Sequence, residues 1–372
     1  MIPRLTRAFI RWTAKPSVGR PLFSSSAGRP LEKSRDTCQH FRYPMRNTRT
    51  MTARTLILLL TLSSACTSLA EEKPDYDPLR VPPGAAEVET RDLTMPDPAR
   101  NREIPMRIYL PRTEGPAPLI VFSHGLGGSR ADNPYLGQHW AQRGYFVVFL
   151  QHPGSDSSVW RDARPGETRA AMQSAASIEN FILRIQDVQF FLDAAAGDQP
   201  WTAQIDSDRI GIAGHSFGAV TGQALGGQQF PGRAFTEPRI NAALMLSPSA
   251  AVVGTQEDAF GEVAIPWMLI TGSHDHAFLS RQTPATRQTI FPALPEGGKY
   301  EVVLHGAEHT SYNEQPLPGE RLPRNPNHHR AILALSTAFW DTHLQGDDQA
   351  RIWLQGTGPR RILEADDIWK MK

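Results

Sequence analysis

Runs of consecutive apolar residues recur after position 105, and each run is bounded by glycine, proline or polar residues. Uninterrupted runs are typical of strands covered on both faces, whereas alternating apolar and polar residues indicate a strand with one face in solvent. Residues 106–110 alternate in this way and predict an early edge strand. The uninterrupted runs predict buried strands at residues 118–122, 145–150, 210–213, 242–246, 267–271 and 300–304.

Amphipathic segments lie between some of these strands. Apolar residues recur at helical spacing in residues 135–143, 176–192 and 329–344, which predicts three helices that each bury one face. Buried strands separated by helices favour a mostly parallel sheet with helices on both faces. Residues 87–372 therefore predict a single α/β domain, and their number suits that size of domain.

The residues before this domain have a different composition. Residues 1–50 are rich in arginine and poor in acidic residues, and we interpret them as an over-extended or disordered leader, with an organelle transit peptide as the alternative. Residues 51–70 contain a basic start, a short apolar run and a small-residue cleavage site, which is the pattern of a signal peptide. The apolar run is too short to span a membrane. Residues 71–86, rich in proline and acidic residues, predict a linker.

Cysteine positions and charge narrow the chemistry and the partners. Cys38 and Cys66 both precede the predicted domain, so the rest of the chain offers neither a disulfide framework nor a thiol nucleophile. Leu62 to Cys66 resembles a lipoprotein box, so a lipid anchor at Cys66 is an alternative to a soluble secreted or periplasmic protein. The net charge of +1 creates no overall field that attracts nucleic acid. We expect no nucleic-acid partner and no transmembrane helix in the mature protein.

A serine lies between two glycines directly after a predicted buried strand. Gly214, Ser216 and Gly218 fit the pattern Gly-x-Ser-x-Gly, and the residues that follow are small and apolar, as a helix packed closely on a sheet requires. In a sharp strand-to-helix turn the serine adopts strained backbone angles, and glycines two positions away remove the clashes. We therefore interpret Ser216 as a nucleophile. The alternative is a glycine-rich turn with an inert serine.

A serine hydroxyl is a weak nucleophile until a base accepts its proton, and an acidic residue orients that base. The two last predicted buried strands are each followed by a suitable side chain, in the order acid and then histidine. Asp275 is the candidate acid and His309 the candidate base. Glu308 and Asp258 are weaker candidates for the acid.

When an activated serine attacks a carbonyl group, negative charge develops on the carbonyl oxygen of the substrate. Two backbone N–H groups stabilise this charge in an oxyanion hole. We expect one from Phe217, directly after the nucleophile, and one from Leu126 in the glycine-rich loop 122–129. This loop lacks the lysine and the spacing of a P-loop, and no acidic residue lies where a dinucleotide fold needs one. The alternative is a flexible glycine-rich loop.

Two insertions predict a small lid beside the substrate pocket. Residues 153–167 contain Trp160, and residues 277–292 contain Phe278. We expect both aromatic side chains to line the pocket, and we expect His215 either to line it with them or to have a structural role. The alternative is that the aromatic side chains only pack the lid.

The other histidines have simpler interpretations. His305, inside the last predicted strand, is expected to be buried. His274 and His276 flank the candidate acid, but a pair of histidines without a further ligand cluster is weak evidence for a metal site. We expect no metal and no cofactor.

The chain resembles the α/β-hydrolase superfamily, and more narrowly the dienelactone-hydrolase-like and platelet-activating-factor-acetylhydrolase-like serine esterases. The segments Phe122 to Gly127 and Gly214 to Gly218 carry the resemblance, which extends from about Arg107 to Leu344. It implies an α/β-hydrolase fold with small lid insertions, hydrolysis of small-molecule or lipid esters without a cofactor, and secretion in many bacterial members.

The chain departs from both groups at the proposed site. Dienelactone hydrolases proper have a cysteine where Ser216 stands. Plasma-type acetylhydrolases carry their acid soon after the strand that corresponds to residues 242–246, where this chain has only serine and proline. The substrates of the two groups therefore do not transfer directly.

The sequence thus predicts a carboxylic ester hydrolase, acting on short acyl chains through an acyl-enzyme, in a secreted or periplasmic location. The alternatives are a phospholipid acetylhydrolase of the platelet-activating-factor type, a serine peptidase or amidase, and a hydrolase-fold protein that binds without catalysis. The chain has no room for the propeller that many such peptidases carry, which favours esters.

Overall fold

A nine-stranded sheet runs through the described part of the chain. The computed structural model describes residues 75–85, 87–314 and 320–372. The predicted leader (1–50), the signal peptide (51–70) with Cys66, and part of the linker (71–86) lie outside the described residues. Those predictions therefore stay predictions.

The middle of the sheet is parallel, in the strand order β4-β3-β5-β8-β9-β10. Antiparallel strands extend it at both edges: β2 and then β1 beside β4, and β11 beside β10. A short ribbon, β6 with β7, forms a separate pair. The strands are β1 (Glu89–Asp97), β2 (Arg102–Leu110), β3 (Ala117–Ser123), β4 (Phe146–Leu150), β5 (Ile205–His215), β6 (Gln229–Phe230), β7 (Arg233–Ala234), β8 (Ile240–Leu246), β9 (Trp267–His274), β10 (Lys299–Glu308) and β11 (Ile368–Met371).

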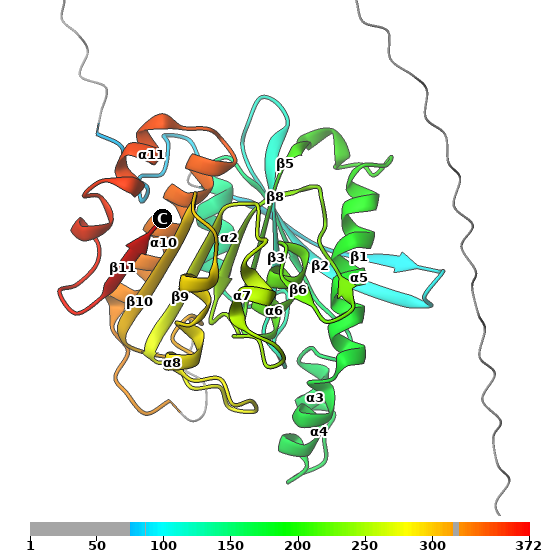
Figure 1. The fold of residues 1–372 in the computed structure, drawn as a ribbon. Coiled ribbons are helices and arrows are strands. Elements are labelled where there is room, and N and C mark those ends of the chain that lie inside the picture. The colour runs from blue at the N-terminus through cyan, green and yellow to red at the C-terminus, as the bar shows by residue number, and fades with distance from the viewer. Residues whose placement is uncertain (1–74, 86, 315–319) are drawn as a thin grey trace, which may run out of the picture. The chain divides into compact units, whose positions relative to one another are not determined.

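Helices cover both faces of this sheet (Figure 1). The helices α5, α6, α7 and α9 contribute to the apolar core on one face, and α2, α10 and α11 contribute to the core on the other. This arrangement confirms the predicted α/β-hydrolase fold class. The helices are α2 (Pro134–Gln142), α3 (Ser158–Arg161), α4 (Thr168–Ala175), α5 (Ile178–Ala195), α6 (Phe217–Leu225), α7 (Gln256–Phe260), α8 (Pro284–Arg287), α9 (Ile290–Ala293), α10 (Pro326–His343) and α11 (Asp348–Gln355), with short 3₁₀ turns at Thr202–Gln204 and Pro359–Arg361.

Alternation along a single strand explains why the central runs are apolar throughout. In β4, Phe146 and Val148 belong to the core under α5 and α6, whereas Val147 and Phe149 belong to the core under α2 and α10. Successive side chains point to opposite faces of a strand, so a strand covered on both faces has no polar position. All five residues of β4 are buried.

The predicted helices begin and end within three residues of the observed ones, and local capping accounts for two of their starts. The Ser177 side chain accepts a hydrogen bond from the Asn180 N–H and caps α5. The Asn325 side chain accepts one from the Asn327 N–H and caps α10, whose first position is taken by Pro326. Among the described residues, no helix is long and apolar enough to cross a membrane.

The start of α6 approaches β3 very closely, and this contact positions the region around Ser216. A Cβ atom built on Gly218 would lie 1.8 Å from the backbone oxygen of Ser123, a distance that no side chain tolerates. Further along the same helix, a Cβ atom on Gly222 would meet nothing closer than 3.7 Å, at the side chain of Ile212. Only the first of these two glycines is required by contact with the strand.

This difference gives a matched pair of substitutions. Gly218→Ala is expected to lower the free energy of unfolding by about 1–3 kcal/mol or more, because the backbone of α6 or β3 must shift to accept the methyl group. Gly222→Ala is expected to keep or raise it, because alanine favours a helix by roughly 0.8–1 kcal/mol over glycine. Urea titration of both variants measures the difference. Equal stability of the two would contradict the close approach.

Candidate active site

Ser216 lies in a strained turn between β5 and α6. Its backbone angles are φ 55° and ψ −114°, and a non-glycine residue with positive φ is uncommon. Gly214 faces the start of the helix so closely that a Cβ atom there would lie 2.3 Å from the Gly218 oxygen. The two glycines therefore permit the turn that presents the serine hydroxyl above the end of β5.

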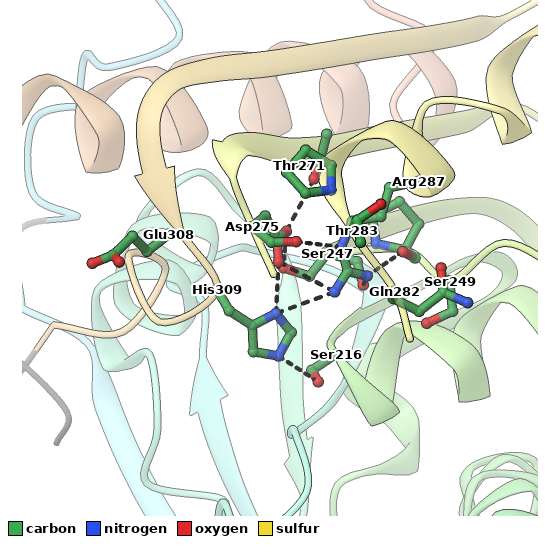
Figure 2. Close-up of polar contacts among 12 residues, drawn as sticks. Ser216, Ser247, Ser249, Thr271, Asp275, Gln282, Thr283, Arg287, Glu308 and His309 are labelled. Atoms are coloured by element: carbon green, nitrogen blue, oxygen red, sulfur yellow. Dashed lines mark hydrogen bonds and ion pairs between the residues drawn. The ribbon is translucent and has the colours of Figure 1, made fainter. Parts of the chain in front are cut away.

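Three predicted site residues from distant parts of the chain lie in one line of hydrogen bonds (Figure 2). His309 Nε2 is 2.8 Å from Ser216 Oγ, and His309 Nδ1 is 2.7 Å from Asp275 Oδ1. Since a carboxylate only accepts, Nδ1 donates to Asp275 and Nε2 is left to accept the serine proton. Asp275 follows β9 and His309 follows β10, so the carboxyl ends of adjacent parallel strands bring them together.

The other oxygen of Asp275 is held by hydroxyl groups. Asp275 is fully buried, and its Oδ2 accepts hydrogen bonds from Thr271 Oγ1 at 3.0 Å, from Tyr312 Oη at 3.2 Å and from Ser247 Oγ. Ser247 itself has a positive φ of 56° at the end of β8. None of these three hydroxyl donors is marked by a sequence motif, because they come from three separate segments.

A buried arginine completes the surroundings of the carboxylate (Figure 2). Arg287 on α8 is 2% exposed, and its Nη2 lies 3.2 Å from Asp275 Oδ1 and 3.3 Å from His309 Nδ1. Its other nitrogens donate to the backbone oxygens of Asp275, Ser247 and Pro248. The guanidinium therefore fixes the segment after β8 and the segment after β9 against each other.

These contacts decide the charge state of the carboxyl group. Burial alone would raise the pKa of Asp275, but the hydrogen bond and charge of His309 together with the charge of Arg287 outweigh it, and the pKa lies well below its usual value of 3.8. Asp275 is therefore ionised throughout the neutral range.

His215 lies behind the line of hydrogen bonds and is 6% exposed. Its Nε2 donates to the backbone oxygen of His309 at 2.9 Å, and the rings of the two histidines are 5.1 Å apart. Burial, followed by the charge of His309, lowers the pKa of His215 to about 3, so the ring is neutral at pH 7. His215 supports the backbone of His309, and its predicted place in a substrate pocket stays a prediction.

The predicted oxyanion loop passes beside the serine. A Cβ atom on Gly125 would lie 3.2 Å from Nδ1 of His215 and 3.5 Å from Cβ of Ser216. Within the described residues the N–H groups of Leu126 and Phe217 donate to no acceptor, whereas the N–H of Gly127 donates to the Ser155 oxygen at 2.9 Å. An oxyanion hole requires two such free donors, and the assignment to Leu126 and Phe217 stays a prediction.

The two aromatic side chains of the predicted lid are both exposed, and each contacts a different segment. Trp160 on α3 is 46% exposed and donates through Nε1 to the Gly127 oxygen at 2.7 Å. Phe278, in the segment after β9, is 73% exposed, and the guanidinium of Arg169 on α4 lies 5.5 Å from its ring centre. The insertion that carries α3 and α4 thus contacts both the oxyanion loop and the segment after β9.

The remaining candidates lie outside this arrangement. His305 is exposed, so the expectation that it is buried was wrong: β10 loses its regular pairing with β9 after Leu304. His274 is also exposed and contacts Ser273. In residues 75–85, 87–314 and 320–372 no group of three or more His, Cys, Asp or Glu side chains is arranged to hold a metal. A cavity of about 250 Å³ lies at the far end of α6, beside Glu237, and does not include Ser216.

The lowered pKa of Asp275 predicts a pH-dependent contribution to stability. Its folded pKa is below the ordinary value of 3.8, so the stabilisation is fully present above about pH 4 and is lost as the pH falls further. At pH 6 the free energy of unfolding of Asp275→Asn is expected to be about 3–5 kcal/mol below that of the wild type, because the buried Arg287 keeps its charge but loses its carboxylate partner. The difference from the wild type should shrink below pH 4.

Urea titration at pH 6, 4 and 3 measures this difference. The exposed Asp162→Asn is the control, and it should unfold as the wild type does at each pH. A difference between the wild type and Asp275→Asn that stays constant from pH 6 to pH 3 would show that the carboxylate is not held in its charged form.

Comparison with known proteins supports the α/β-hydrolase fold. Residues 107–189 match the family described as platelet-activating factor acetylhydrolase, isoform II. This segment contains β3, the oxyanion loop, α3, α4 and most of α5.

Two curated proteins, each named platelet-activating factor acetylhydrolase, are similar to the chain. The protein from Canis lupus familiaris is 29% identical over 141 residues, covering 30% of this chain and 32% of its own. The protein from Gallus gallus is 25% identical over 142 residues, covering 28% of this chain and 34% of its own. The chain thus matches about a third of the length of these relatives. The chain has an α/β-hydrolase fold, with a parallel sheet and a strained turn at Ser216, and over residues 107–189 it is similar to the platelet-activating factor acetylhydrolases.

Proposed function

We propose that this protein hydrolyses carboxylic esters with short acyl chains through a serine acyl-enzyme. The observation that supports this most strongly is the line of hydrogen bonds from Ser216 through His309 to the buried Asp275. The hydroxyl lies on a strained turn, the imidazole has the tautomer of a general base, and the carboxylate is ionised.

The reaction follows from the position of each group. Ser216 Oγ attacks the ester carbonyl carbon while Nε2 of His309 accepts its proton, and the Asp275 carboxylate stabilises the imidazolium that forms. The carbonyl oxygen becomes an oxyanion that accepts hydrogen bonds from the N–H groups of Leu126 and Phe217, each typically worth ~10²–10³ in rate. The imidazolium then donates its proton to the leaving alcohol, and a water molecule activated by the same imidazole releases the acid.

A second candidate is the hydrolysis of a short acyl group from a phospholipid. The matched segment 107–189 favours it, because the matching family and relatives are named platelet-activating factor acetylhydrolase. The exposed Trp160, which contacts the loop 122–129, and the exposed Phe278 offer apolar surface for the rest of such a substrate. Nothing comparable favours a peptide substrate.

For the location we propose export from the cytoplasm. The signal-peptide pattern of residues 51–70 supports it, and a lipid anchor at Cys66 is the alternative to a freely secreted or periplasmic enzyme.

Replacement of the proposed nucleophile tests both the enzyme and the residue. Ser216→Ala is expected to abolish labelling by a fluorophosphonate probe and to lower ester hydrolysis by about 10⁶-fold, to the rate left by binding alone. Ser207→Ala, at the exposed beginning of the same strand β5, is the matched control and should label and turn over as the wild type does. Labelling that persists in Ser216→Ala would contradict the assignment, and a wild-type protein that neither labels nor turns over would favour a binding protein.

A substrate panel tests the acyl length and the leaving group. We expect p-nitrophenyl acetate and butyrate to be hydrolysed with kcat/KM at least tenfold above that of p-nitrophenyl palmitate. We expect p-nitroanilides to be inert, since their amine leaving group departs only when a general acid protonates it. The phospholipid candidate predicts that an sn-2 acetyl phospholipid is a better substrate than the matched sn-2 palmitoyl one. Anilide turnover comparable to that of esters would favour an amidase.

A further inference from the structure

A fully buried arginine on α5 joins the end of β3, the segment after β4 and the beginning of α6. Arg184 is 0% exposed. Its Nη2 donates to Ser123 Oγ at 3.0 Å and to the backbone oxygen of His124, both at the start of the oxyanion loop. Its Nη1 donates to Ser155 Oγ at 2.9 Å, and the Ser155 backbone oxygen in turn accepts from the N–H of Gly127. One guanidinium thus holds the oxyanion loop at two points.

The same guanidinium contacts the N-terminal half of α6. Its Nε donates to Thr221 Oγ1 at 3.2 Å, and its central carbon lies 4.8 Å from the centre of the Phe217 ring. Phe217 carries the second proposed oxyanion donor. Arg184 is therefore in contact with both segments whose N–H groups are proposed to hold the oxyanion.

A second line of buried groups fixes the arginine from behind. Ser123 Oγ is 2.9 Å from His152 Nε2, and His152 Nδ1 is 3.0 Å from Asp187 Oδ2. Asp187 also accepts from Arg102 on β2 and Arg100 just before it. Burial lowers the pKa of His152 to about 4. The hydrogen bonds from His152 and Arg102 and the charge of Arg102 outweigh burial and lower the pKa of Asp187 to about 2. His152 is therefore neutral, donates to Asp187 and accepts the Ser123 proton.

This second line cannot act as a nucleophilic site. Its serine, Ser123, is 0% exposed and its hydroxyl accepts a hydrogen bond from Arg184, so no substrate reaches it. Its hydroxyl hydrogen is directed to His152, which leaves the oxygen lone pairs for the arginine. The line orients Arg184 and has no free reactive atom.

Within the part of the chain that the structure describes, Arg184 is a buried cation without a carboxylate in contact, which is unusual in a protein interior. Among the described residues no carboxylate forms an ion pair with it, and its partners are hydroxyl groups, a backbone oxygen and an aromatic ring. Burial lowers its pKa to about 9, which still leaves it charged at pH 7. A buried cation without a contacting anion destabilises the fold, and such departures from the most stable arrangement are expected at functional sites.

We propose that Arg184 is a positioning residue that sets the distance and the direction of the two N–H donors, those of Leu126 and Phe217, toward a substrate oxygen. The inference rests on the proposed ester hydrolysis and adds to it the group that assembles its oxyanion hole. Misplacement of donors by about 1 Å lowers the rate roughly 10²-fold, so a fixed spacing matters for the chemical step more than for binding.

Two substitutions of the arginine and one control test this. Arg184→Met removes the hydrogen bonds and the charge at similar length, and Arg184→Lys keeps the charge but cannot reach all the acceptors. Arg143→Met is the matched control, because Arg143 is also largely buried and contacts a carboxylate, a backbone oxygen and an aromatic ring, yet lies on the opposite face beside Asp341.

We expect Arg184→Met to lower kcat for p-nitrophenyl acetate about 10- to 100-fold with KM within about twofold, and to slow fluorophosphonate labelling in parallel. Arg184→Lys should fall between it and the wild type. Arg143→Met should lower the melting temperature without changing kcat at 25 °C, which separates positioning from a loss of stability.

Hydrogen–deuterium exchange on the same proteins gives a readout that does not depend on turnover. Peptides covering residues 123–128 and 217–221 should exchange faster in both Arg184 variants than in the wild type and in Arg143→Met. A folded Arg184→Met with wild-type kcat, or with unchanged exchange in both segments, would overturn the inference. If Arg184→Met does not fold, Arg184→Lys decides in the same way. A different result separates the two proposals. If the wild-type protein hydrolyses no ester, yet both segments exchange faster in the Arg184 variants, then the positioning role stands and the proposed function is overturned.

Discussion

The contact between α6 and β3 is the constraint on which the rest of the site depends. Gly218 lets the helix begin directly against the Ser123 carbonyl, so that the turn at Ser216, the oxyanion loop and the N-terminus of α6 all lie within a few ångströms. The helix begins there with free N–H groups and a partial positive charge. A side chain at position 218 would separate the hydroxyl from the donors that the proposed reaction needs, even if every other residue stayed in place.

Two buried arginines stabilise this region from opposite sides. Arg287 contacts the Asp275 carboxylate directly, so its charge is compensated locally, and it keeps the carboxylate ionised beside His309. Arg184 contacts only neutral acceptors and the Phe217 ring. The carboxylates of Asp187 and Asp156 act on the charge of Arg184 without an ion pair among the described residues.

The sequence was sufficient to predict the elements whose cause is local. Burial on both faces makes the central strands apolar throughout, so the strands could be predicted from the sequence. The spacing Gly214-x-Ser216-x-Gly218 is itself the condition for the turn, so the turn could be predicted as well. Ser247, Tyr312 and Arg287 around the carboxylate were not, because each is brought there by a long-range contact that leaves no periodic pattern. His305 was misjudged for a related reason: its strand leaves regular pairing with its neighbour, and no single-strand pattern reports that irregularity.

The polar residues around Ser216, His309 and Asp275 decide how the proposed site differs from an inert turn. A serine on a strained turn with an unsupported imidazole nearby would still be a weak nucleophile. Here His215 holds the backbone of His309, three hydroxyl groups hold the second oxygen of Asp275, and a second buried line ending at Asp187 holds the arginine behind the oxyanion loop. Each network costs desolvation and lowers the freedom of a different segment. Their common effect is that the hydroxyl, the base and the two donors are fixed before any substrate arrives, which is the condition under which electrostatic stabilisation of a transition state is most effective.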